Sequence, residues 1–154
     1  KKKIVKPALV LNVVPQEKLL AAAIESQGIT VTMEHKLTGD VDCVQLDIGW
    51  EVKSTSDLVS SFVGTKEKKE PRLQEQLTRM LDTYKEPVLL IWDWFAPAAG
   101  NYIMTPKRMR FVNWDAVWNA LLFWQRRGIL LDLAASREHA ARRIVMLAKN
   151  KEAK

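Results

Sequence analysis

Cysteine is nearly absent from this chain of 154 residues, since Cys43 is the only one. A single cysteine excludes an internal disulfide and a zinc site built on several thiolates, and it favours a reducing compartment. No segment approaches the ~20 apolar residues of a membrane span, and the stretch from Lys1 to Pro7 lacks the apolar core of a signal peptide. The sequence therefore predicts an intracellular protein, nuclear or cytoplasmic, with no membrane partner.

Negative charge is scarce in the last third of the chain. Residues 105–154 hold 11 Lys and Arg against 4 Asp and Glu, whereas residues 1–104 hold 13 against 14. The net charge of +6 is thus carried by the C-terminal third. This asymmetry suits a polyanion such as nucleic acid, although a basic solvated surface kept for solubility explains the charge equally well.

Internal repeats and low-complexity segments are also missing, which predicts a single domain over residues 1–154 with basic tails at 1–7 and 149–154. Apolar runs and alternation predict strands at 8–14, 29–37, 41–47, 50–54, 87–92 and 129–133. Helical spacing and cap residues predict helices at 15–27, 54–63, 71–85, 113–127 and from Ser136 onward. This order predicts an α/β fold with three layers, a mixed sheet flanked by helices.

Two further expectations concern residues outside the regular pattern. His35 lies on the apolar side of the strand predicted at 29–37, so it is expected to be a satisfied core histidine. The stretch from Phe95 to Arg110 contains Pro97, Gly100 and Pro106, which predicts a loop with a basic tip. A mixed-charge loop is expected at 65–70, after a helix that ends at Gly64.

The densest chemistry lies between Gly39 and Asp57, where several acids surround one lysine. In a strand, successive side chains point to opposite faces, so Glu51 and Lys53 share one face and Trp50 and Val52 the other. A hairpin turning at 47–49 brings Asp40 or Asp42 beside Glu51. Two neighbouring carboxylates repel unless a cation lies between them, which points to a hard divalent metal with Lys53 close by.

The remaining acids of this stretch have structural explanations. Asp42 and Asp47 fit roles in the hairpin and its turn. Asp57 follows Ser54 by three residues, the spacing of a helix capping box, and an acid in the first helical turn complements the helix dipole. The working set is therefore Asp40, Glu51 and Lys53, with Asp57 explained either as a helix-start acid or as support for the site.

A known family shares this spacing. The order Gly39-Asp40, ten residues, Glu51-Val52-Lys53, three residues, Asp57 resembles the signature of the XPF-type structure-specific endonucleases. The stretch from Arg72 to Gln76 is similar to the family's Arg-Leu-x-x-Gln, and Tyr84 to Ile91 is similar to its Tyr-x-x-Pro lead into a buried strand. The resemblance covers roughly residues 8–148.

The resemblance implies a restriction-endonuclease-like core of the Glu-x-Lys nuclease superfamily, acting in DNA repair or recombination. The implied activity is Mg²⁺- or Mn²⁺-dependent cutting of one strand in branched or flapped DNA, by a homodimer or heterodimer. By position, Asp40 and Glu51 bind metal, Lys53 serves the attacking water, and Asp57, Arg72 and Gln76 support the site or the DNA. The expected phosphate contacts are Lys107, Arg108 and Arg110, with Arg142 and Arg143 as secondary candidates.

The chain departs from the family pattern in three places. Asn12-Val13-Val14-Pro15 stands where the family usually has Asp-x-Arg-Glu, and Glu17 is the nearest acid. Val52 replaces the usual arginine, and no tandem helix-hairpin-helix module is expected in this chain. These departures keep open a second hypothesis, a catalytically impaired DNA-binding or scaffold subunit of a nuclease complex. A third is a restriction- or resolvase-like enzyme on the same fold.

Overall fold

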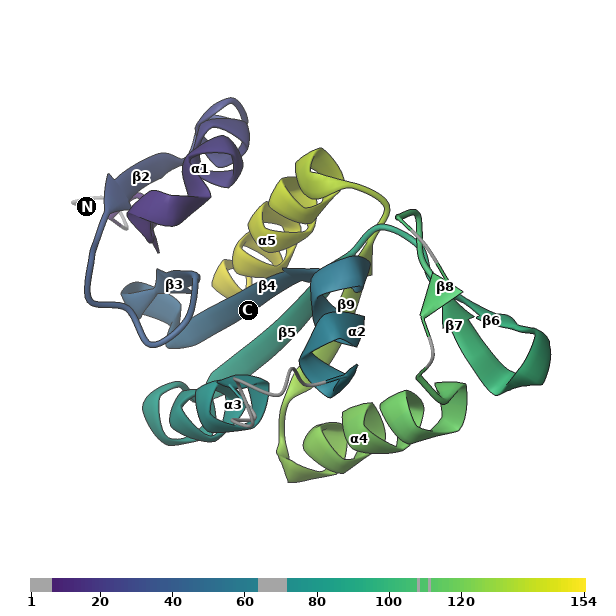
Figure 1. Cartoon of the computed structure of the whole chain (residues 1–154). Helices are drawn as coiled ribbons and strands as arrows, with labels where there is room; N and C mark the ends of the chain where they lie inside the picture. Colours follow the sequence, from purple (N-terminus) through teal and green to yellow (C-terminus); the bar gives the residue numbers. More distant parts are fainter. Residues whose placement is uncertain (1–6, 64–71, 108, 111) are drawn as a thin grey trace, which may run out of the picture.

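A six-stranded mixed sheet forms the centre of the chain, as seen in a computed structural model that describes residues 7–63, 72–107, 109–110 and 112–154 (Figure 1). Its strand order is β2-β1-β3-β4-β5-β9. The β1/β2, β4/β5 and β5/β9 pairs are parallel, whereas β1/β3 and β3/β4 are antiparallel. The strands are β1 Val10–Val13, β2 Thr30–Met33, β3 Val41–Cys43, β4 Ile48–Ser54, β5 Glu86–Trp92 and β9 Leu130–Ala134.

Helices cover both faces of this sheet (Figure 1). One layer holds α1 (Lys18–Glu25), which follows the 3-10 turn η1 (Pro15–Glu17), and α5 (Arg137–Glu152). The other layer holds α2 (Thr55–Val63), α3 (Arg72–Thr83) and α4 (Trp114–Arg127). Two separate buried clusters, one on each face, match these layers. The predicted three-layer α/β fold is confirmed.

Strand alternation sorts the side chains of the two central strands. Trp50 and Val52 of β4 lie in the cluster beneath α1 and α5, together with Val88 and Leu90 of β5. Leu89 of β5 lies in the opposite cluster, and β4 and β5 are in parallel register with Glu51 beside Leu89. Glu51 therefore faces the α2, α3 and α4 layer, as the period of two predicts.

The predicted hairpin is present, with a turn earlier than expected. β3 and β4 pair antiparallel, and the connection is the 3-10 turn η2 (Val44–Leu46) followed by Asp47 in the left-handed region (φ 56°). Ile48 and Gly49 belong to β4 and not to the turn. Asp47 therefore has the turn role assigned to it, whereas the strand predicted at 41–47 ends at Cys43.

The expectation for His35 is wrong. β2 ends at Met33, and His35 is exposed. β2 is an edge strand that pairs only with β1, and Val31 is its one partly buried residue. The apolar side of the pattern packs against the core at Ile29 and Val31, but the strand ends at Met33, so His35 lies beyond its covered part.

The loop predicted from Phe95 to Arg110 is instead a small three-stranded antiparallel sheet. It consists of β6 (Ala96–Ala98), β7 (Tyr102–Met104) and β8 (Met109–Arg110), and it lies at one side of the molecule (Figure 1). Gly100 (φ 75°) and Asn101 (φ 65°) form the turn between β6 and β7. Both residue types tolerate the left-handed region, which allows so tight a reversal.

The predicted start and end of α4 and the predicted start of α5 are confirmed. Asn113 caps α4 by accepting from the N–H of Ala116 (3.1 Å), Gly128 ends it, and Ser136 caps α5 by accepting from His139 (3.1 Å). The predictions for Gly64 and for the 65–70 loop lie outside the described residues. Among the helices that the structure describes, none is long and apolar enough to cross a membrane.

Candidate active site

The predicted site lies where β3 and β4 part. β3 pairs with β4 only as far as Trp50, so the backbone edge of β4 beyond that residue has no strand beside it. Asp40, just before β3, replaces the missing strand: its N–H donates to the Trp50 carbonyl (2.8 Å), and its Oδ2 accepts from the Val52 N–H (2.8 Å). These two hydrogen bonds hold the Asp40 carboxylate next to Glu51.

Glu51 is a carboxylate with little solvent around it. Only 8% of its surface is exposed, and Lys53 Nζ lies 4.0 Å from its Oε1. Burial, and then the negative charge of Asp40, raise the pKa of Glu51 to about 7, against the opposing effects of Lys53 and Gln76. Burial also raises the pKa of Asp40. The Asp40 and Glu51 carboxyl groups are held together against their mutual repulsion, an arrangement that a cation between them would stabilise.

Gln76 on α3 contacts this pair directly. Its Nε2 donates to Glu51 Oε2 (3.0 Å) and to the carbonyl of Thr38, and its Oε1 accepts from Arg79 (2.8 Å). The amide orientation is thereby fixed from three sides. Gln76 leaves Glu51 Oε1 facing Lys53 and ties α3 to the segment that leads into Asp40.

Glu17 is a further acid at this place, and strand and helix patterns alone did not select it. Val14 donates its N–H to the carbonyl of Asp40 (3.0 Å), and Glu17 donates its own N–H to the Val14 carbonyl (3.0 Å). Burial, followed by Asp40, raises the pKa of Glu17, while Arg137 and Lys53 lower it. The 3-10 turn η1 therefore brings a half-buried carboxylate into the electrostatic neighbourhood of Asp40.

Arg137 is a further residue near the site that the sequence analysis did not select. It is the first residue of α5, it lies over the Trp92 ring (5.1 Å), and it acts on Glu17 electrostatically. Its position after the cap Ser136, at the end of the sheet where β4 and β5 finish, is the only sequence signal that points to it.

The side-chain amide of Asn12 hydrogen-bonds to Asp42, an acid outside the predicted set. Its Nδ2 donates to Asp42 Oδ1 (2.8 Å), and the Tyr84 hydroxyl donates to Asp42 Oδ2 (3.0 Å). Asp42 is 6% exposed, so both of its oxygens are satisfied inside the protein. Asp42 is thus a buried structural acid, which agrees with its predicted hairpin role, and Asn12 serves that network.

The other predicted residues are spread around the site. Asp57 is exposed in the first turn of α2, where its N–H donates to the Ser54 cap (3.1 Å). Lys107 and Arg142 are exposed, but Arg143 is engaged: its Nε lies 3.1 Å from both Asp132 oxygens. The predictions for Arg108 and for the side chains of Arg72 and Arg110 lie outside what the structure describes.

The donor set fits a divalent cation of the magnesium type. Magnesium commonly takes one or two carboxylates and completes its shell with water and substrate phosphate. Asp40 and Glu51 supply two hard oxygen donors with raised pKa values, which a cation between them would lower. Within the described residues no group of three or more His, Cys, Asp or Glu side chains is placed to hold a metal, so the site offers two carboxylates and no closed cage.

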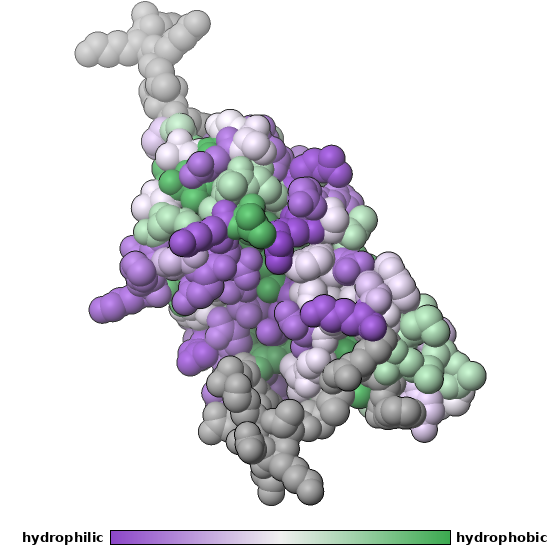
Figure 2. Space-filling view, turned by 45° about the horizontal axis from the view of Figure 1, so that its top comes forward, coloured by the Kyte–Doolittle hydropathy of each residue, from purple (hydrophilic) through white to green (hydrophobic). Residues whose placement is uncertain are grey.

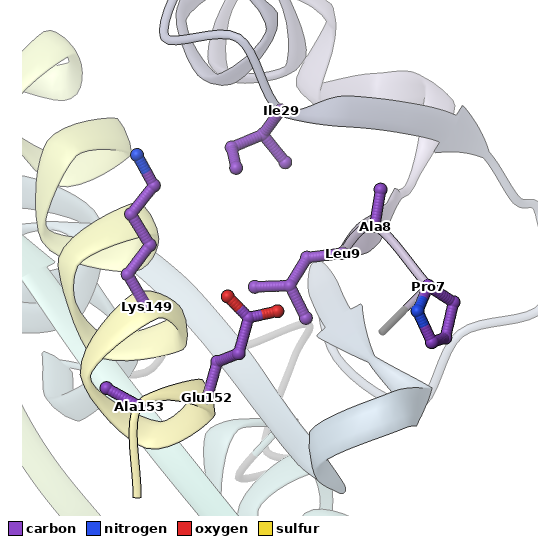
Figure 3. A pocket seen from close by; sticks show the side chains of 7 residues that line it. All are labelled: Pro7, Ala8, Leu9, Ile29, Lys149, Glu152 and Ala153. Atoms are coloured by element: carbon purple, nitrogen blue, oxygen red, sulfur yellow. The ribbon is translucent and has the colours of Figure 1, made fainter. Parts of the chain in front are cut away.

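The predicted catalytic residues lie where β3 and β4 part, and none of them lines the hollow that Figure 3 shows. A hollow of about 470 Å³ lies instead at the other end of β1 and α5, between Leu9 and Ile29 on one side and Lys149 and Glu152 on the other (Figure 3). Its lining contains one carboxylate and one ammonium, and no residue of the predicted set.

Comparisons with known proteins identify a matching family and two similar structures. A family model described as the ERCC4 domain matches residues 12–147. Two solved structures of XPF from Aeropyrum pernix are similar to this chain. The first has a TM-score of 0.71 and 22% identity, covering 91% of this chain and 60% of that one. The second, a complex with DNA, has a TM-score of 0.72 and 24% identity, covering 94% and 65%.

The two structural matches establish the fold of the chain and no more. The chain spans less than two thirds of either Aeropyrum protein, and at these identities the likeness shows the fold. None of the curated protein sequences matches the chain.

Proposed function

The chain belongs to the ERCC4 domain family, and from that premise we propose that it is a divalent-metal-dependent endonuclease that hydrolyses a phosphodiester in one strand of branched or flapped DNA. The observation that carries the proposal is the convergence of Asp40 and Glu51 at a buried strand edge, with Lys53 Nζ 4.0 Å from Glu51. The complex of the similar Aeropyrum protein with DNA supports the choice of polymer.

Each residue of this set has a distinct task in the proposal. A Mg²⁺ or Mn²⁺ ion held by Asp40 and Glu51 would lower the pKa of a bound water and neutralise charge on the phosphate. Lys53 donates hydrogen bonds to the attacking water or to a phosphate oxygen, so its ammonium opposes the negative charge that develops there. Gln76 keeps the Glu51 carboxylate oriented through its 3.0 Å contact.

The remaining predicted residues act on the nucleic acid or on the shape of the site. We assign Asp57 and Arg72 to support of the site, and Lys107, Arg108, Arg110 and Arg142 to phosphate contacts. Arg143 is a weaker candidate for a phosphate contact because its guanidinium is already paired with Asp132. Phosphate contacts of this kind fix position without reading sequence.

The direct test is cleavage of labelled flap, fork and plain duplex DNA with Mg²⁺ or Mn²⁺. We expect nicks in one strand at the branch, lost in Asp40→Ala and Lys53→Ala and kept in Glu25→Ala, which removes an exposed acid of α1. Absence of cutting with every divalent metal, by protein that is folded and binds DNA, contradicts the proposal.

One observation favours the second candidate, a DNA-binding or scaffold subunit without activity. Asn12 stands where the related pattern has an acid, and its amide is committed to Asp42. Under this alternative, forked DNA binds with the usual dependence on salt, and neither Lys53→Ala nor the removal of metal changes the affinity. The cleavage assay above separates the two candidates.

A further inference from the structure

The small sheet formed by β6, β7 and β8 presents one apolar face. In its register Ala96 opposes Met104, Ala98 opposes Tyr102, and Met104 opposes Met109. Opposed residues share a face, and so do residues two apart on one strand. The outer face of this sheet is therefore formed by side chains without charge, namely Ala96, Ala98, Tyr102, Met104 and Met109.

The outer face is open to solvent. Tyr102 is 37% exposed, Met104 42% and Met109 45%. In the space-filling view, the side of the molecule where Figure 1 places β6 and β7 is pale green, the colour of moderately hydrophobic residues (Figure 2). Apolar side chains gathered on one exposed sheet face, as distinct from scattered ones, mark a binding surface.

The opposite face of the small sheet is fixed to the body of the protein. Ile103, between Tyr102 and Met104, is fully buried in the cluster that includes Val117 and Leu121 of α4. Phe95, just before β6, stacks on Trp118 (5.9 Å between ring centroids). Ile103 and Phe95 therefore anchor the small sheet to α4, whereas Pro97, which opposes Ile103, is exposed.

Two hydrogen bonds place this sheet beside the candidate active site. Thr55 Oγ1 donates to the carbonyl of Trp94 (3.0 Å), and Ser56 Oγ bonds to Thr105 Oγ1 (3.3 Å). Thr55 and Ser56 open α2 and follow Lys53 by two and three residues. The small sheet therefore lies close to Lys53, within reach of a polymer that has a phosphate there.

The segment that forms the small sheet is positively charged, which suits a polyanion such as DNA. Residues 96–110 contain three basic residues and no Asp or Glu, and Lys107 is exposed in the connection between β7 and β8. Methionine and other apolar side chains contact and separate base steps in nucleic-acid complexes, and aromatic side chains stack on unpaired bases. The segment itself carries no acid, and Asp115 of α4 accepts from the Asn101 side chain at the β6–β7 turn (3.2 Å), which pairs that carboxylate with an amide. Apolar side chains beside a lysine match bases and phosphates together.

We propose that the outer face of the β6–β8 sheet covers the unstacked bases at a branch in the DNA, where duplex and single strand meet. Tyr102, Met104 and Met109 contact the base planes, and Lys107 contacts a neighbouring phosphate. This inference rests on the proposed function and adds to it the surface that recognises the branch.

The test compares forked with plain duplex DNA of the same length, bound without divalent metal so that no cutting occurs. The variant is Met104→Ser/Met109→Ser, and the matched control is Met146→Ser, a methionine of α5 that is 50% exposed in the other helical layer. We expect about tenfold weaker binding of the fork by the double variant, the size of a lost base contact, with plain duplex changed less than twofold. The control binds both DNAs as the wild type does.

A second readout reports on the bases themselves. With 2-aminopurine at the first unpaired position of the fork, wild-type protein and Met146→Ser should change its fluorescence, and Met104→Ser/Met109→Ser should not. Circular dichroism and thermal unfolding confirm that the variants are folded.

Three results would overturn the inference. The first is an unchanged affinity of the double variant for the fork, and the second is an equal loss of affinity for the fork and the plain duplex. The third is a wild-type dimer that the double variant dissociates without a change in fork preference. The last would make the outer face a protein interface. Cleavage by the wild type with no effect of the double variant on the fork overturns this inference alone. Fork recognition through the outer face without any cleavage supports it and removes the nuclease proposal.

Discussion

A methyl group on Gly39 would lie 2.6 Å from the carbonyl oxygen of Trp50. Asp40, the next residue, donates its N–H to that same oxygen (2.8 Å). The contact that positions the Asp40 carboxylate therefore requires glycine before it for reasons of space, since Gly39 has no positive φ. This explains at the level of atoms why Gly-Asp, and not Asp alone, precedes the hairpin.

Gly39→Ala should push Asp40 away from Glu51 and weaken binding of Mn²⁺ at least tenfold, measured by isothermal titration calorimetry. Gly28→Ala is the matched control: Gly28 has φ 84° and no neighbouring atom within 4 Å of the added methyl. That variant should lower the unfolding temperature through backbone strain and keep the Mn²⁺ affinity. Equal Mn²⁺ affinities for Gly39→Ala and wild type would contradict this account.

Glu51 links pH to stability. Its pKa in the folded protein is about 7, above the ordinary value of 4.5, so between these values the folded state binds more protons than the unfolded state. The metal-free protein should therefore lose stability as the pH rises through this window. Glu51→Gln removes the effect, and at pH 8 we expect it to unfold about 2–6 °C above the wild type.

Differential scanning calorimetry of metal-free protein at pH 5 and pH 8 measures this difference. Glu25→Gln, which changes an exposed acid of α1, should leave the wild-type dependence on pH intact. Added Mg²⁺ should stabilise the wild type more at pH 8 than at pH 5, because the ion competes with protons for the carboxylates. Parallel pH profiles for Glu51→Gln and the wild type would refute the assignment.

At the scale of elements, the short 3-10 turn η1 determines the position of Glu17. The sequence predicts one helix from Pro15, but the chain forms the 3-10 turn Pro15–Glu17 before α1 begins at Lys18. Glu17 thereby lies at the junction and near Asp40, not on the solvent side of a continuous helix. Glu17 can therefore be tested as a replacement for the acid that is usual at the position of Asn12.

Glu17→Gln should weaken Mn²⁺ binding about threefold to tenfold and slow cleavage, because one negative charge near the cation is lost. Glu25→Gln on the same helix is the control and should change neither quantity. Titration calorimetry and single-turnover cleavage give the two numbers. Unchanged values for Glu17→Gln would show that its carboxylate plays no part.

Two adjacent arginines of α5 are expected to have different roles, one in stability and the other in the proposed DNA binding. Arg143 pairs with Asp132 of β9, whereas Arg142 is exposed. Arg143→Ala should lower the free energy of unfolding by roughly 0.5–1 kcal/mol, the scale of a partly exposed pair. Arg142→Ala should leave stability unchanged and weaken DNA binding, as urea unfolding and fluorescence anisotropy would reveal. The reverse result would exchange the two assignments.

For the whole molecule, the placement of charge predicts how the proposed DNA binding depends on salt. The excess positive charge belongs to residues 105–154, which include the end of the small sheet, α4 and α5. Binding should therefore weaken steeply as salt displaces lysine and arginine from phosphates.

Lys107→Ala should weaken binding to all DNAs alike and reduce the slope of log K against log salt by about one unit. Lys85→Ala is the control, because this exposed lysine precedes β5 at the opposite end of that strand from the small sheet. Anisotropy titrations at several salt concentrations measure both slopes. A loss confined to forked DNA would assign Lys107 to the branch and not to the phosphate backbone.

Much of the fold was predictable because local chemistry sets it. The alternation of β4, the caps Ser54, Asn113 and Ser136, and the stop at Gly128 all act within a few residues, and the structure keeps each of them. The prediction for His35 failed because β2 ends at Met33, and the length of a strand depends on its pairing with a neighbouring strand, which no local pattern records. The β6–β8 sheet was missed because its strands are short and carry proline and glycine.

The sequence by itself determined which side chains share a strand face, and therefore that Glu51 and Lys53 stand together with Asp40 near them. It also determined the helix ends, since caps are local hydrogen bonds. Only the tertiary structure decided that Asn12 serves Asp42, that Gln76 orients Glu51, and that Glu17 approaches Asp40. These contacts join residues that are distant in sequence or lie across a turn, and their geometry is fixed by how the helices pack on the sheet.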